Sequence, residues 1–123
     1  NILEGLRLYS PKTKTILLSS SSIYGIQSIT PFEESMVPNP LSPYGASKYA
    51  METIANQYFQ FYQLPLVIVR PFSIYGPRGR IDMAPFLVIR AAEAGQVFIQ
   101  YGSNENNRRD WTYIDNFVAG IMK

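Results

Sequence analysis

The sequence of 123 residues contains no cysteine and no histidine. Their absence excludes disulfides, thiolate and imidazole metal sites, and mechanisms that use a cysteine nucleophile or a histidine base. Acid–base chemistry must therefore use tyrosine, lysine, aspartate or glutamate. The sequence also has no apolar run near the roughly 20 residues that cross a bilayer, and no basic-then-apolar leader before a cleavage site. We therefore expect a cytoplasmic protein that does not contact membranes.

Positive and negative side chains nearly balance, because the formal net charge is only +2. A charge this small does not indicate a nucleic-acid partner. The second half of the chain is nevertheless rich in arginine, whose planar guanidinium binds phosphate through paired hydrogen bonds. A small phosphorylated ligand and an ordinary solvated surface are both open interpretations of these arginines.

The pattern of apolar residues and breakers predicts an α/β fold. A helix is predicted at the start of the chain, a long loop at 19–41 and a second loop at 71–84. Strands buried on both faces are predicted at 15–18 and 66–69, with a helix capped by Ser42 between them. Further along the chain, the pattern predicts a helix at 85–94, a strand at 97–99 and a last helix capped by Asp115. Strand, helix and strand form a βαβ unit of a parallel sheet. Two strands cannot cover the faces of such a unit, so we expect a fragment of a larger protein or completion by another copy.

Tyr44 and Lys48 lie four residues apart, on one face of the predicted long helix and near its start. An ammonium next to a phenol favours the phenolate, which makes the phenol a better base at neutral pH. The alternative is a solvent-facing pair that arises by chance. Four serines, 19–22, follow the first strand at its carboxyl end, where open parallel sheets bind ligands; a solvated turn is the alternative there.

Five segments occur together in one order and spacing: the serines before Ile23-Tyr24-Gly25, S-P-Y-G-A-S-K at 42–48, R-P-F-S-I-Y-G-P at 70–77, G-R-I-D-M-A at 79–84 and R-R-D-W-T-Y-I-D at 108–115. In the order and spacing of these segments the chain resembles the extended short-chain dehydrogenase/reductase family. Within that family it is most similar to the nucleotide-sugar epimerases and dehydratases, particularly the UDP-glucuronate and UDP-glucose 4-epimerases. The resemblance implies that residues 1–76 form the C-terminal half of a Rossmann-type parallel sheet that binds NAD. It also implies the start of a small α/β domain that binds a nucleoside-diphosphate sugar in residues 77–123.

The resemblance also implies roles for individual residues. Tyr44 would be the base that takes the proton of a sugar hydroxyl, Lys48 would bind the nicotinamide ribose and lower the pKa of the phenol, and Ser20 would relay the proton. The expected cofactor-binding residues are Ser19, Tyr44, Lys48, Pro71 and Phe72. The expected substrate-binding residues are Ser21, Ser22, Ser73, Arg80 and Arg109. Arg70 and Arg108 could equally be salt-bridge partners. Family members often form homodimers through the helix that carries the tyrosine.

Two features refine the expected reaction. Ser21 and Ser22 stand where dehydratases of the family carry carboxylates, which favours epimerisation, expected at C4, over loss of water. Ile81 and Leu87 replace a usual proline and arginine of the glucuronate subgroup, so the identity of the sugar is left open.

No glycine-rich dinucleotide turn occurs in the chain, and we therefore expect the chain alone to be inactive. A dehydratase, a reductase and a non-catalytic binding or assembly module are the alternatives.

Overall fold

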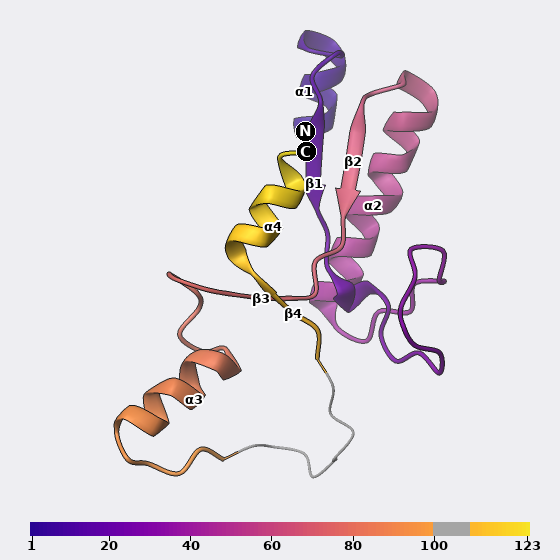
Figure 1. The fold of residues 1–123 in the computed structure, drawn as a ribbon. Helices are drawn as coiled ribbons and strands as arrows, with labels where there is room; N and C mark the ends of the chain where they lie inside the picture. The colour runs from indigo at the N-terminus through magenta and orange to yellow at the C-terminus, as the bar shows by residue number, and fades with distance from the viewer. Residues whose placement is uncertain (100–108) are drawn as a thin grey trace. The chain divides into compact units, whose positions relative to one another are not determined.

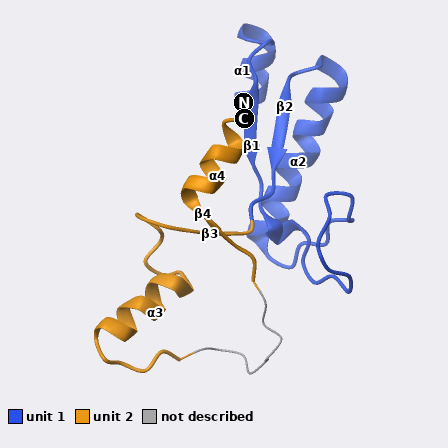
Figure 2. Ribbon diagram, in the orientation of Figure 1, with its two compact units in different colours: residues 1–71 blue, residues 72–123 orange. Residues whose placement is uncertain are grey.

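A computed structural model describes residues 1–99 and 109–123, which form two compact units, residues 1–71 and 72–123 (Figures 1 and 2). The predicted domain boundary lies after residue 76, whereas the units divide between Pro71 and Phe72. Among the described residues, no helix combines the length and the apolar character needed to span a bilayer.

Unit 1 is built around a parallel βαβ motif (Figure 1). Its elements are α1 (Ile2–Tyr9), β1 (Thr15–Leu18), the short 3-10 helix η1 (Ser21–Ile23), α2 (Pro43–Tyr62) and β2 (Leu66–Val69). The two strands pair in parallel, in a register that runs from Thr15 opposite Leu66 to Leu18 opposite Val69. The predicted strands and the predicted long helix are confirmed, whereas η1 forms inside the segment predicted as loop.

Helix α2 starts and ends where its sequence signals lie. The Ser42 side chain accepts a hydrogen bond from the Gly45 backbone N–H at 3.1 Å, and Pro43 occupies the first helical position. At the other end, Gln63 adopts the left-handed conformation with φ 54° and donates its backbone N–H to Phe59. The Ser42 cap fixes the start of α2, which places Tyr44 in its first turn.

The core of unit 1 lies between η1, α2 and one face of the sheet. Its fully or nearly buried apolar side chains are those of Ile23, Tyr24, Ala55 and Leu64. On the other face of the sheet the side chains are open: Ile16 is 41% exposed and Val67 is 56% exposed. The prediction that both strands are buried on both faces is therefore wrong for the described residues, because α2 packs on one face while α1 packs against α2.

Unit 2 contains β3 (Ser73–Tyr75), α3 (Ala84–Glu93), β4 (Trp111–Tyr113) and α4 (Ile114–Ile121). Strands β3 and β4 pair in parallel, with Ser73 opposite Trp111. Gly76 follows β3 with φ 147°, and a Cβ there would lie 2.5 Å from the Ile114 side chain, so only glycine fits this approach to α4. The predicted helix at 85–94 is confirmed with a shift of one residue.

Three predictions for this unit are wrong. Residues 97–99 form no strand: Val97 is 89% exposed, and no described segment pairs with these residues to satisfy their backbone groups. The segment 71–84 is not all loop, because it contains β3. Tyr113, not Asp115, occupies the N-cap position of α4. Asp115 lies in the first helical turn, where a carboxylate interacts favourably with the helix dipole.

Candidate active site

The serine cluster forms a tight turn at the carboxyl end of β1. Ser19 and Ser20 are buried, with exposed fractions of 3% and 9%. The Ser20 Oγ caps η1: it accepts a hydrogen bond from the Ser22 backbone N–H at 3.1 Å and donates to the Ser22 Oγ at 3.1 Å. The Ser21 N–H donates to the Pro71 carbonyl at 3.0 Å, just beyond β2. The turn is thereby held at the carboxyl ends of both strands.

The start of α2 packs directly on this turn. Gly45 is buried there, and a Cβ at this position would lie 2.6 Å from the Ser22 carbonyl oxygen and 3.1 Å from the Pro40 Cβ. Only glycine allows so close an approach. Tyr44 precedes this glycine and remains 55% exposed. The chain therefore brings an accessible phenol to the same edge of the sheet as the serines.

Lys48 joins the helix to the end of β1. Its Nζ donates a hydrogen bond to the Leu18 carbonyl oxygen at 2.7 Å. The same Nζ lies 5.8 Å from the centroid of the Tyr44 ring, within the range of a cation–π contact. Ser20, Tyr44 and Lys48, which supply a hydroxyl, a phenol and an ammonium, thus all lie on unit 1 near the carboxyl end of β1. This set can bind and move a proton of a ligand hydroxyl without a metal, and the described residues contain no group of side chains suited to a metal ion.

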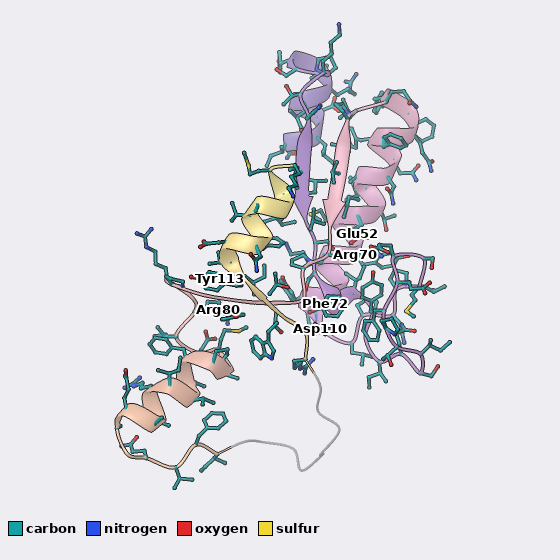
Figure 3. All side chains as sticks on the ribbon, in the orientation of Figure 1. Glu52, Arg70, Phe72, Arg80, Asp110 and Tyr113 are labelled. Atoms are coloured by element: carbon teal, nitrogen blue, oxygen red, sulfur yellow. The ribbon has the colours of Figure 1, made fainter. Side chains whose placement is uncertain are left out.

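An ion pair lies at the same edge, between α2 and the residue that follows β2 (Figure 3). The Arg70 guanidinium donates to Glu52 from Nε at 3.0 Å and from Nη2 at 2.7 Å. The Arg70 Nη1 donates to the Tyr24 hydroxyl and to the Glu34 carbonyl oxygen, each at 2.9 Å. Arg70, which the sequence left open as a possible salt-bridge partner, is therefore part of a partly buried network.

Electrostatics within this pair favour the charged forms. The Glu52 side chain is only 3% exposed, and this burial alone would raise the pKa of its carboxyl. The hydrogen bonds from Arg70, with a smaller contribution from Ser19, outweigh burial and hold that pKa below its ordinary value. The hydrogen bonds to Glu52 raise the pKa of Arg70 despite partial burial. The Ser19 Oγ is itself buried and has no hydrogen-bond partner of full geometry among the described residues.

Glu52 is the residue of this site that sequence reasoning missed. A signal for it was present, since Tyr44, Lys48 and Glu52 follow one another at intervals of four and therefore share one face of α2. Its partner could not be read from the spacing alone.

The expected substrate-binding residues of the C-terminal segment all lie in unit 2. Ser73 begins β3 and donates its backbone N–H to the Asp110 carbonyl at 3.3 Å. Arg109, which is exposed, precedes Asp110 and lies two residues before Trp111, the partner of Ser73 in the β3–β4 pair. Arg80 is exposed in the loop before α3 and forms an ion pair with Asp82, which lowers the pKa of that carboxyl.

Two further expected residues lie on either side of the unit boundary. Pro71 ends unit 1, and Phe72, which is 39% exposed, begins unit 2. Arg108, the other possible salt-bridge partner, lies outside the described residues.

A parallel βαβ unit with its polar side chains at the carboxyl ends of the strands is the arrangement of a Rossmann-like fold. Residues 1–123 match the model of the NAD dependent epimerase/dehydratase family, and the chain belongs to this family.

Individual relatives agree with this assignment. The chain is 40% identical over 125 residues to UDP-glucuronate 4-epimerase 6 of Arabidopsis thaliana, covering 99% of this chain and 27% of that protein. It is similar to the crystal structure of UDP-glucuronic acid 4-epimerase from Bacillus cereus in complex with UDP-glucuronic acid and NAD, with a TM-score of 0.88, 35% identity and coverage of 98% of this chain and 38% of that one. It is also similar to the structure of dTDP-glucose 4,6-dehydratase from Bacillus anthracis in complex with NAD, with a TM-score of 0.90, 30% identity and coverage of 98% and 39%. The chain thus spans well under half the length of these relatives.

Proposed function

We propose that the whole protein containing this chain is an NAD-dependent epimerase of a UDP-sugar, acting at C4 by transient oxidation to a keto intermediate. The observation that carries the proposal is the gathering of Ser20, Tyr44 and Lys48 at the carboxyl end of β1, in a chain that belongs to the NAD dependent epimerase/dehydratase family. The names of the relatives, UDP-glucuronate 4-epimerases among them, support the substrate class.

The residues present fit a nicotinamide cofactor. Lys48 carries three N–H donors, one of which binds the Leu18 carbonyl, so its ammonium can also donate to the hydroxyls of a ribose. Ser19, Pro71 and Phe72 stand at or just beyond the strand ends, and we assign them to the nicotinamide side of the site. When bound, NAD supplies the hydride acceptor for the oxidation of C4.

The chain's own groups carry the proton. Tyr44 takes the proton of the C4 hydroxyl, and the Ser20 Oγ donates a hydrogen bond to the same oxygen. Lys48 places its positive charge beside the phenol while the phenol holds negative charge. When C4 is reduced again from its other face, the proton returns to the C4 oxygen from Tyr44 by the same path, so the residues end each cycle as they began it.

The serine turn favours epimerisation over dehydration. Dehydration needs an acid for the leaving hydroxyl and a base for the neighbouring carbon, and Ser21 and Ser22 offer hydroxyls in those places. The nearby carboxylate, Glu52, is engaged by Arg70. Because a dehydratase is among the similar structures, dehydration is the second candidate that the product analysis must test.

We propose substrate-binding residues in each unit, taken separately. Ser21 and Ser22 would contact the sugar, and Ser73, Arg80 and Arg109 would contact the sugar and the diphosphate. In domain terms, residues 1–76 would belong to the NAD-binding domain and residues 77–123 to the substrate-binding domain. We further propose a cytoplasmic homodimer that packs through α2, whose Phe61 is 74% exposed.

The test is product analysis of the whole protein with NAD and, separately, UDP-glucuronate and UDP-glucose. The expected product is the C4 epimer, with no NADPH consumed and no water lost. Tyr44→Phe should lower turnover by about 10²- to 10⁴-fold, the usual contribution of a positioned general base. Tyr49→Phe, on the same helix, is the matched control and should turn over normally. A dehydrated keto product would support the second candidate, and absence of any turnover would support a binding or assembly module.

A further inference from the structure

We propose that the Glu52–Arg70 ion pair is a positioning device, which holds the serine turn and the Tyr44–Lys48 face of α2 in the arrangement needed for proton transfer. This inference rests on the proposed function of the Ser20–Tyr44–Lys48 site. Neither member of the pair is assigned to substrate or cofactor, so the pair would act through the residues that it holds.

Arg70 connects three segments that are distant in sequence. Its guanidinium binds Glu52 on α2, the Tyr24 hydroxyl directly after η1, and the Glu34 carbonyl in the loop that leads to α2. Its neighbour Pro71 accepts the hydrogen bond of the Ser21 N–H. Arg70 therefore stands where the serine turn, the loop and the helix meet.

Glu52 fixes the rotation of α2 about its own axis. Lys48 binds the last carbonyl of β1, and Glu52 binds the residue that follows β2. Two attachments on one helix face, one to each strand end, allow only one orientation of that face. Tyr44 lies on the same face, about 12 Å along the axis from Glu52 at 1.5 Å per residue. Loss of the Glu52–Arg70 attachment would let the Tyr44 phenol shift relative to Ser20.

An ion pair suits this role better than an apolar contact. Buried ion pairs add little net stability over well-packed apolar residues, but the guanidinium holds its donors in a rigid planar fork. Here that fork makes bonds in several directions at once, and the Tyr24 ring also lies 5.1 Å from the guanidinium carbon. The Arg70 guanidinium therefore fixes the orientation of the segments that it binds as well as their distance from one another.

The test compares steady-state kinetics of Glu52→Gln and Glu4→Gln in the whole protein. Glu4 forms the other Glu–Arg ion pair of unit 1, with Arg7 in α1, and its side chain is 42% exposed. A displacement of about 1 Å at a reacting group can cost on the order of 100-fold in rate. For Glu52→Gln we expect kcat to fall by about 10- to 100-fold, while KM for the UDP-sugar changes less than about threefold. Glu4→Gln should match the wild type, and Glu52→Asp should recover part of the lost kcat.

Two further measurements keep the outcome decisive. Tyr24→Phe keeps the ion pair but removes the hydrogen bond that links Arg70 to the end of the serine turn. It therefore tests the proposed hold on the turn if Glu52→Gln does not fold, and we expect its kcat to fall as well. A folded Glu52→Gln or Tyr24→Phe protein with wild-type kcat, or with a raised KM alone, would overturn the proposal. If the wild type shows no epimerisation, the proposed function fails, and amide hydrogen exchange then tests the positioning. Faster exchange at the Ser21 and Tyr24 amides in Glu52→Gln supports it, and unchanged exchange overturns it.

Discussion

Replacement of Gly45 by alanine should destabilise the protein, although the same change usually stabilises a helix. The helix propensity of alanine exceeds that of glycine by about 1 kcal/mol. At Gly45 the added methyl would lie 2.6 Å from the Ser22 carbonyl oxygen and 3.1 Å from the Pro40 Cβ. Neither neighbour is the flexible end of a side chain, so the start of α2 must move away from the serine turn. Such overpacking costs about 1–3 kcal/mol.

Gly5→Ala is the matched control, because Gly5 also lies in a helix and a Cβ there has no neighbour within 4 Å. We expect Gly5→Ala to be neutral or stabilising, and the two variants to differ by about 2 kcal/mol in the free energy of unfolding. Urea denaturation followed by circular dichroism measures this difference. Turnover of Gly45→Ala should also fall, since Tyr44 is the adjacent residue. If Gly45→Ala proves as stable and as active as Gly5→Ala, the close contact between α2 and the serine turn is refuted.

Two other predictions concern charge. The folded state holds the pKa of the Glu52 carboxyl below its ordinary 4.5. This carboxylate therefore contributes stability that is present above about pH 4.5 and is lost as the pH falls through the folded pKa. Denaturation midpoints measured against pH should fall more steeply in acid for the wild type than for Glu52→Gln, and equal slopes would contradict this prediction. Arg109→Ala should weaken UDP binding by about tenfold or more, as expected for a charge-assisted hydrogen bond. Titration of the fluorescence of Trp111, the single tryptophan of these 123 residues, measures the affinity, and an unchanged affinity would exclude Arg109 from the diphosphate site.

Much of unit 1 could be predicted from sequence because its signals are local. Ser42 and Pro43 mark the start of α2, and two short apolar runs mark β1 and β2. Once these strands are parallel, their carboxyl ends meet at one edge, which is why Ser20, Tyr44 and Lys48 could be placed together from sequence. The cap at Ser42 even identified the turn of the helix in which Tyr44 lies.

The remaining features depend on partners that sequence patterns do not reveal. β3 and β4 have three residues each, too few to show alternation, and they exist because they pair with each other. Residues 97–99 have the composition of a strand but no described partner. The Glu52–Arg70 pair joins residues 18 apart, and it depends on how α2 is rotated over the sheet. The apolar runs of β1 and β2 predicted burial on both faces, and packing covers only one in the described residues.

The central claim is that Tyr44 and its neighbours act on a sugar whose C4 is transiently oxidised. The most direct measurement follows a UDP-sugar carrying deuterium at C4 through turnover by the whole protein with NAD. The account predicts a C4 epimer that retains the deuterium at C4, because the hydride leaves and returns within one site. Loss of the label from C4, either to solvent or to C6 of a dehydrated product, would contradict the account.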